Sequence, residues 1–145
     1  MKIYLDTYSI YRPLDIKNQT RILLEAEAVL GIIMLCDLKE IELVSSFVLE
    51  FEINNNLLPI RREHGRQVLA LASFTVPLTE SIEQRARVLC QFGLQPLDAL
   101  HLASAEEANA HYLCTCDDNF LKKSSILNSR VAVVSPIDCL KEIAS

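Results

Sequence analysis

Apolar and polar positions follow two alternating patterns along the whole chain. Short apolar runs, which are typical of buried strands, occur at residues 2–6, 41–46, 74–79, 111–115 and 131–136. Between these runs apolar residues recur at helical spacing, as after Thr20, where Ile22, Ala26, Val29 and Ile33 share one face. The alternation predicts a three-layer α/β/α sandwich with a mainly parallel central sheet and helices on both faces.

Several residues mark where the predicted helices begin and end. Ser46 can cap a helix that the asparagines at 54–56 close, and Pro59 and Pro96 suit the first position of two further helices. Gly93 is expected to stop the helix before Pro96. No repeat, linker or low-complexity segment interrupts the pattern, and 145 residues suit one compact domain. We therefore predict a single domain over residues 1–145.

Composition narrows the class of protein. The mean hydropathy is +0.22, but no apolar run approaches the roughly 18 residues that a membrane span requires, so we expect a soluble protein. The five cysteines are odd in number and scattered, which is not typical of a disulfide framework. Because residues 2–6 resemble a strand rather than a secretory signal, we expect a cytoplasmic protein. The net charge of −5 gives no overall attraction for nucleic acid.

Two of the cysteines, Cys114 and Cys116, lie beside a pair of acids in the segment "YLCTCDDNF". Only Thr115 separates them, so they lack the two-residue spacing of thiol redox pairs and zinc knuckles. They alternate along a predicted strand and so share one face of it. We interpret them as small core residues and the acids that follow as the informative part.

Acidic side chains occur in four segments that the predicted fold can bring together. They are Asp6, which ends the first strand; Glu50 and Glu52, on the helix after the second strand; Asp98, in the first turn after Pro96; and Asp117 and Asp118, after the strand at 111–115. Ligands bind beyond the carboxyl ends of parallel strands, so these acids can converge on one site. Clustered carboxylates repel one another, and an all-oxygen set suits Mg²⁺ or Mn²⁺.

Each acid also has a simpler interpretation. Asp6 alone could be a turn or cap residue, Asp98 could bind helix N-terminal amides, and the two glutamates could be solvated helix residues. His101 follows Asp98 at a spacing that would suit a Zn²⁺ pair. The other two histidines have no helical ligand partner, so we interpret His101 as a structural residue or as support for a neighbouring ligand.

Four segments carry a resemblance to a known family. "YLDTYSIYRPL", "SSFVLEFEINNN", "LQPLDALHLASAEEANAHYLCTCDDNFLKK" and "VVSPIDCL" together resemble the PIN-domain nucleases, the group that includes the VapC-type toxin ribonucleases. The segment from "DALHLASA" to "LCTCDDNFL" is the most specific part. In the family a small polar residue commonly follows "DT", whereas here Tyr8 stands before Ser9.

The resemblance implies a PIN-like fold and a metal-dependent endoribonuclease. Asp6, Glu52, Asp98 and Asp117 match the family's acids and are expected to hold one or two Mg²⁺ or Mn²⁺ ions, with Glu50 as the alternative to Glu52. Asp118 is expected to support these ligands. Thr115 and Ser9 are expected either to hydrogen-bond the acids or to serve only as turn residues.

The expected partners follow from the same resemblance. RNA is the expected substrate, and the candidates for contacting it are Arg12, Lys122, Lys123, Arg61, Arg62 and Arg66. A cognate antitoxin and a homodimer are the expected protein partners. The alternative function is a catalytically weak or inactive PIN-like protein that acts as an RNA- or protein-interaction module.

Overall fold

The computed structural model describes residues 1–145, and its centre is a sheet of five parallel strands. The strands are β1 (Lys2–Leu5), β2 (Glu42–Ser46), β3 (Phe74–Val76), β4 (Tyr112–Cys114) and β5 (Ala132–Val134). Their order is β3-β2-β1-β4-β5, so β1 is central and pairs with both β2 and β4. Parallel strands alternating with helices confirm the predicted α/β fold class.

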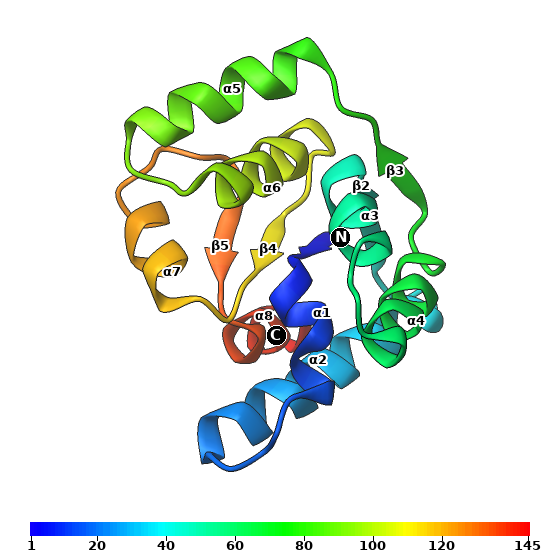
Figure 1. Ribbon diagram of the computed structural model, residues 1–145. Coiled ribbons are helices and arrows are strands. Elements are labelled where there is room, and N and C mark those ends of the chain that lie inside the picture. The colour runs from blue at the N-terminus through cyan, green and yellow to red at the C-terminus, as the bar shows by residue number, and fades with distance from the viewer.

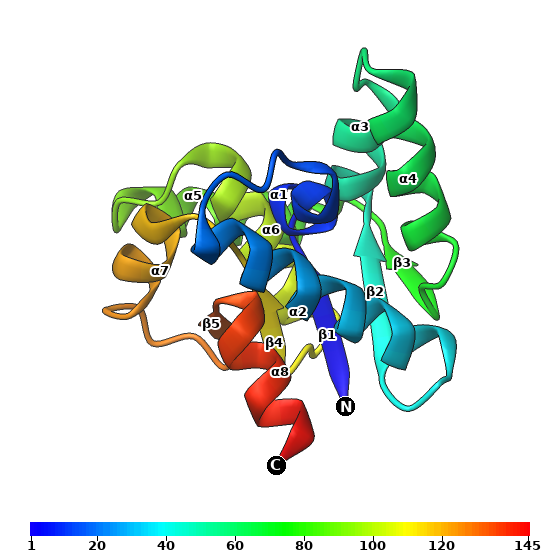
Figure 2. The same cartoon turned by 90° about the horizontal axis from the view of Figure 1, so that it is seen from below.

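Helices cover both faces of this sheet. They are α1 (Thr7–Tyr11), α2 (Thr20–Asp37), α3 (Phe47–Asn54), α4 (Pro59–Leu69), α5 (Glu80–Gln91), α6 (Pro96–Glu107), α7 (Asp118–Ser124) and α8 (Pro136–Ala144), with a 3₁₀ helix at Arg12–Leu14. The pair α2 and α8 lies on one face, and the pair α5 and α6 lies on the other (Figures 1 and 2). In Figure 2, β1 runs from the N-terminus up to α1, so α1 lies at the carboxyl-end edge of the sheet.

Local signals in the sequence set most of the helix boundaries. The side chain of Ser46 accepts a hydrogen bond from Leu49 N at the start of α3, as predicted. Pro59 and Pro96 each occupy the first position of a helix. Gly93 follows the end of α5 with φ of +106°, a conformation that favours glycine, and it therefore ends this helix as expected.

The segment from Thr7 to Leu14 differs from the sequence prediction, which placed no element there. Asp6 caps α1 by accepting a hydrogen bond from Ser9 N at 2.9 Å. A helix of five residues is too short to show a helical repeat of apolar positions, so periodicity could not detect it. The third strand also ends earlier than predicted, at Val76, because Pro77 cannot donate to the sheet.

The core fills the space between the sheet and its two helical layers. Tyr4 and Phe120 are the largest fully buried side chains. Cys114 and Cys116 are also buried, as predicted, although Cys116 lies beyond the end of β4. All five cysteines are free thiols. No helix has both the length and the hydropathy that a membrane span requires.

Gly65 permits close packing between α3 and α4, and its replacement provides a test of this contact. A Cβ at Gly65 would lie 2.7 Å from Ile53 Cγ2, whereas a Cβ at Gly31 in α2 would meet Leu140 at an ordinary 3.6 Å. We therefore expect Gly65→Ala to lower the free energy of unfolding by about 1–3 kcal/mol through overpacking. The matched change Gly31→Ala should raise it by about 0.5–1 kcal/mol. Urea unfolding of both variants measures this, and equal stability of Gly65→Ala and the parent would contradict it.

Candidate active site

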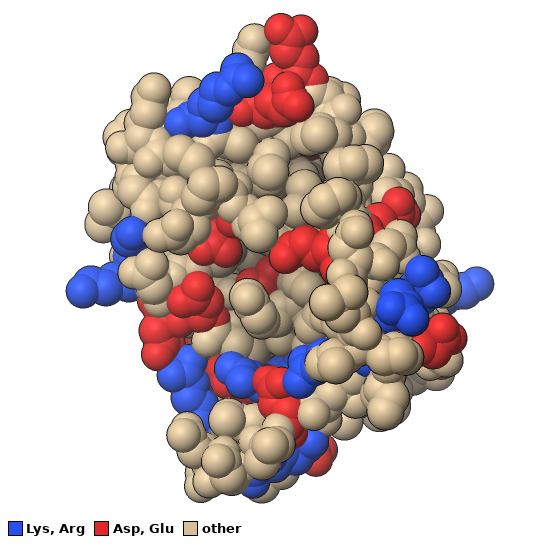
Figure 3. All heavy atoms as spheres, viewed as in Figure 1, with Lys and Arg blue, Asp and Glu red and all other residues tan.

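The strand order places a site at the carboxyl ends of β1 and β4. The chain adds β2 and β3 on one side of β1 and then returns to add β4 and β5 on the other side. In open parallel sheets ligands bind at such a reversal, outside the carboxyl ends of the strands. Figure 3 shows acidic groups gathered around a hollow in the middle of one face, with basic groups along its lower border.

Among the acids predicted to form the site, Asp6 is the most deeply buried, with 3% of its surface exposed. It directly follows β1, and its carboxylate accepts the hydrogen bond that caps α1. Ser9 also joins α1 to β4, because its hydroxyl donates to the carbonyl oxygen of Cys114 at 3.0 Å. Burial raises the pKa of Asp6, while hydrogen bonding by Thr115, the nearby His101 and hydrogen bonding by Ser9 oppose the rise. Ser9 and Thr115 thus lie against Asp6, although Tyr8 intervenes in the sequence.

Glu52 lies on α3 and is half-buried, and it is held by two donors. Its Oε1 accepts hydrogen bonds from Thr7 Oγ1 at 2.8 Å and from His101 Nε2 at 2.6 Å. Burial alone would raise the pKa of Glu52, but the hydrogen bonds from His101 and Thr7 oppose burial, and the pKa is lowered. Glu50 is exposed, and its only hydrogen bond comes from Thr75 at 3.5 Å. Of the two glutamates, the structure therefore brings Glu52 to the other acids.

Asp98 lies in the first turn of α6 and is half-buried. Its pKa is raised to about 6, first by burial and then by the negative charges of Asp117 and Asp6, with a smaller contribution from Glu52. His101 opposes this rise. The shift shows that acids from four separate elements act on one another at this edge of the sheet.

Asp117 and Asp118 are adjacent in sequence but have different surroundings. Asp117 is exposed and caps α7, where its Oδ1 accepts from Asn119 N at 2.9 Å. Asp118 forms two hydrogen bonds of 2.7 Å with Arg21 on α2, and these bonds lower the pKa of Asp118. Asp118 therefore pairs with Arg21, while Asp117 is the residue whose charge reaches Asp98.

The donor chemistry of the four acids fits a hard divalent cation. Mg²⁺ and Mn²⁺ prefer carboxylate oxygens, and a cation among these groups would relieve the repulsion that raises the pKa of Asp98. No three His, Cys, Asp or Glu side chains already form a group that could hold a metal ion. The absence of such a group is compatible with the raised pKa of Asp98. Carboxylate charges act on one another over several ångströms, whereas Mg²⁺–oxygen bonds are about 2.0–2.1 Å long. Ion binding would thus require the carboxylates to move closer together.

Several of the basic residues predicted to contact RNA are engaged within the protein. Arg12 and Arg61 both bind the carboxylate of Asp15, and Arg12 also pairs with the buried Glu25. Arg62 donates to the carbonyl oxygen of Asn56. The remaining candidates are Lys123, which donates to the carbonyl oxygen of Gly93, Arg66, which donates to Asn54, and Lys122, which is exposed.

Four residues of this region were not predicted from the sequence. Tyr4 hydrogen-bonds His101, Thr7 binds Glu52, and Arg21 and Glu25 form an ion pair next to Asp118. Thr7 has a sequence signal, since it directly follows Asp6 in "LDT", and Tyr4 is the one hydroxyl in the apolar run of β1. Arg21 and Glu25 carry no signal, because on a long helix they resemble ordinary solvated charges.

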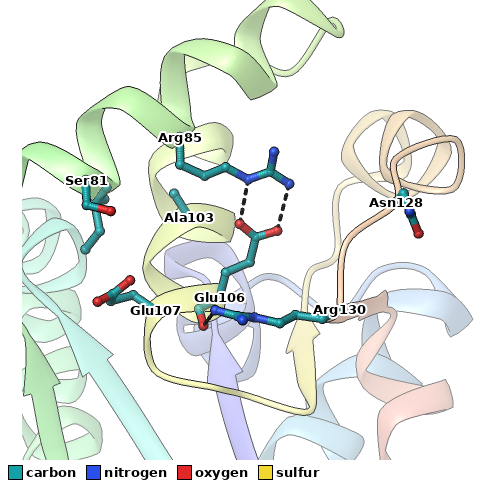
Figure 4. A pocket seen from close by; sticks show the side chains of 8 residues that line it. Ser81, Arg85, Ala103, Glu106, Glu107, Asn128 and Arg130 are labelled. Atoms are coloured by element: carbon teal, nitrogen blue, oxygen red, sulfur yellow. Dashed lines mark hydrogen bonds and ion pairs between the residues drawn. The ribbon is translucent and has the colours of Figure 1, made fainter.

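A cavity of about 380 Å³ lies at the other end of α6 and is separate from the acidic edge. Figure 4 shows Arg85 on α5 forming two bonds with the carboxylate of Glu106, at 2.7 and 3.1 Å. Ser129 donates to the same carboxylate, and Arg130 donates to the carbonyl oxygen of Glu106. These bonds satisfy Glu106 and tie α5, α6 and the segment before β5 together, so we assign the cavity's polar groups a structural role.

Comparison with known proteins gives both a sequence match and a structural match. The family profile described as PIN domain matches residues 3–126. Among solved structures, the crystal structure of VapBC2 from Rickettsia felis bound to a DNA fragment from their promoter contains a chain with the same fold. The similarity has a TM-score of 0.56 at 16% sequence identity and covers 92% of this chain and 98% of that chain. No curated protein sequence matches the chain.

The raised pKa of Asp98 gives a test of the acid cluster in metal-free protein. We expect a pKa of about 6 by ¹³C NMR of the carboxyl carbons, and Asp117→Asn should lower it by removing the strongest neighbouring charge. Asp118→Asn serves as the control and should leave it unchanged, because Asp118 faces Arg21. The folded pKa lies above the ordinary value of 3.8, so this group's contribution to stability falls as the pH rises from about 4 to about 6. An ordinary pKa for Asp98 in the parent would show that the acids do not interact.

Proposed function

Because the chain belongs to the PIN-domain family, we propose that it is a metal-dependent endoribonuclease that cleaves RNA phosphodiester bonds at the acidic edge of the sheet. One observation carries the proposal: the negative charges of four carboxylates from separate elements act on one another, and this repulsion contributes to the raised pKa of Asp98. Such interaction is costly to the fold, and acids with perturbed pKa values gather at catalytic sites. The position at the strand-order reversal supports the same conclusion.

The four acids share one role in the proposed mechanism, which is to hold the ions. Asp6, Glu52, Asp98 and Asp117 would hold one or two Mg²⁺ or Mn²⁺ ions. The bound cation supplies an activated water and neutralises the charge that develops on the phosphate. Thr7 and His101 keep Glu52 ionised and orient it. One of these carboxylates can help to take the proton of the attacking water.

RNA phosphates would contact the basic residues beside the acids. Lys122 is exposed on α7, which begins directly after Asp117. Its ammonium group is the least engaged of the candidate groups, because the other candidates bind groups within the protein. Arg12 and Arg61 lie at Asp15 and can contribute from there. The net charge of −5 means that such contacts attract RNA locally rather than over the whole surface.

The structural relative suggests a biological setting. That structure is a VapBC complex, and we propose that this chain is likewise the toxin of a toxin–antitoxin pair and has a cognate antitoxin. Apolar side chains exposed on α3, in the connection after it and at the start of α4 offer a surface for this partner; they are Phe47, Phe51, Leu57, Leu58 and Ile60. The side chains that α2 exposes suit a second copy of the chain; they are Leu23, Leu24, Leu30 and Met34. Free thiols throughout suit the cytoplasm as the place of action.

Cleavage assays on a panel of structured and unstructured RNAs test the nuclease. We expect cleavage with Mg²⁺ or Mn²⁺ and none with EDTA. Asp6→Asn and Asp98→Asn should each lower the rate by on the order of 100-fold or more, because even residues behind the ligands typically contribute 10–100-fold. Asp138→Asn on α8 is the matched control and should cleave like the parent. Cleavage that survives both site changes would refute the site, and no cleavage of any RNA would favour an interaction module instead.

Binding measurements test the role of Lys122 separately from cleavage. In an Asp98→Asn background, Lys122→Ala should weaken binding of single-stranded RNA and reduce the slope of log affinity against log salt by about 1, since one phosphate contact is lost. Lys141→Ala on α8 removes the same charge from a distant helix and should change neither quantity. An unchanged slope in Lys122→Ala would exclude Lys122 from the RNA contact.

A further inference from the structure

A buried chain of hydrogen bonds runs from the start of α3 to the carboxylate of Glu52. The hydroxyl of Tyr4 lies 2.7 Å from Ser46 Oγ and 2.6 Å from His101 Nδ1, and His101 Nε2 lies 2.6 Å from Glu52 Oε1. Ser46 and Tyr4 are fully buried, and His101 is 3% exposed. At such burial each donor and acceptor needs a partner within the protein.

The direction of each bond follows from the donors and acceptors available. An ionised carboxylate only accepts, so the proton between Glu52 and His101 belongs to Nε2. In the neutral ring Nδ1 then carries no proton and only accepts, so the hydroxyl of Tyr4 donates to it. Ser46 Oγ, which accepts from Leu49 N at 3.1 Å, therefore donates its own proton to the oxygen of Tyr4. This order satisfies every group, with the proton of the imidazole ring on Nε2.

We propose that His101, held by Tyr4, is a positioning residue that fixes the carboxylate of Glu52 so that Oε2 is the oxygen available to a cation. Thr7 donates to the same Oε1, and no hydrogen bond from the protein reaches Oε2. The inference rests on the proposed function, in which Glu52 helps to hold the ion. It also excludes His101 as a ligand in this arrangement, because both ring nitrogens are engaged.

The hydrogen-bond chain starts at the residue that caps α3, and this helps it to orient Glu52. Ser46 caps the helix that carries Glu52, so the same hydroxyl fixes the start of α3 and the first bond of the chain. Fixing a free glutamate side chain in one orientation costs rotamer entropy. Donors that already fix its carboxylate remove part of that cost from ion binding.

Matched substitutions separate positioning from packing. Tyr4→Phe removes one hydroxyl from the chain, and Tyr112→Phe removes a hydroxyl from the opposite end of β4, where it donates to Glu142 at 3.4 Å. His101→Gln keeps an N–H close to the position of Nε2, whereas His101→Leu has a similar volume and no donor.

The first readout is the tautomer of His101 in metal-free protein, measured by ¹⁵N NMR. The parent and Tyr112→Phe should show a protonated Nε2 and an unprotonated Nδ1. Tyr4→Phe should keep the proton on Nε2, which Glu52 holds, but should shift the Nδ1 resonance, because Nδ1 has lost its donor. A proton on Nδ1 of the parent, or an unchanged Nδ1 resonance in Tyr4→Phe, would overturn the inference.

The second readout is Mn²⁺ affinity by calorimetry. His101→Leu should bind about 10–100-fold more weakly than the parent, Tyr4→Phe should lie between the two, and His101→Gln should recover most of the loss. Parent-like affinity in His101→Leu, or equal losses in the leucine and glutamine variants, would contradict positioning. A parent that binds no Mn²⁺ and cleaves no RNA refutes the proposed function instead, and the ring tautomer then still decides whether His101 holds Glu52.

Discussion

The parallel pairing of β1 with β4 is the constraint on which the candidate site depends. The register pairs Leu5 with Cys114, so the two strands end at the same edge of the sheet. Asp6 and Asp117 then begin the helices that follow, and each uses its carboxylate as a helix cap. A shift of this register would separate the two acids and would also break the bond from Ser9 to Cys114.

Around that edge the protein gives similar carboxylates different properties. Hydrogen bonds from Thr7 and His101 lower the pKa of Glu52, whereas burial and neighbouring charges raise the pKa of Asp98 to about 6. One acid is thereby kept ionised and oriented, and in the metal-free protein another keeps its proton to a higher pH. Environments that separate the pKa values of neighbouring carboxyl groups are a general way to divide work between them.

The match to a solved structure at 16% identity shows that the fold requires few particular side chains. Parallel strands need apolar residues on both faces, and helices need an apolar stripe, and many sequences meet both conditions. The same conditions made the five strands and the longer helices predictable from this chain. They did not predict α1, which is one short helix held by the cap at Asp6.

The sequence by itself determined the order of the strands and longer helices, the helix starts at Ser46, Pro59 and Pro96, and the set of acids that could meet. These depend on local patterns and on where strands end. Only the tertiary structure decided which acids do meet, because this depends on groups far apart in sequence. In the folded protein Asp118 binds Arg21, which is 97 residues away in the sequence, and His101 binds Glu52, which is 49 residues away. Such long-range pairings depend on how helices pack against the sheet, and no local pattern encodes them.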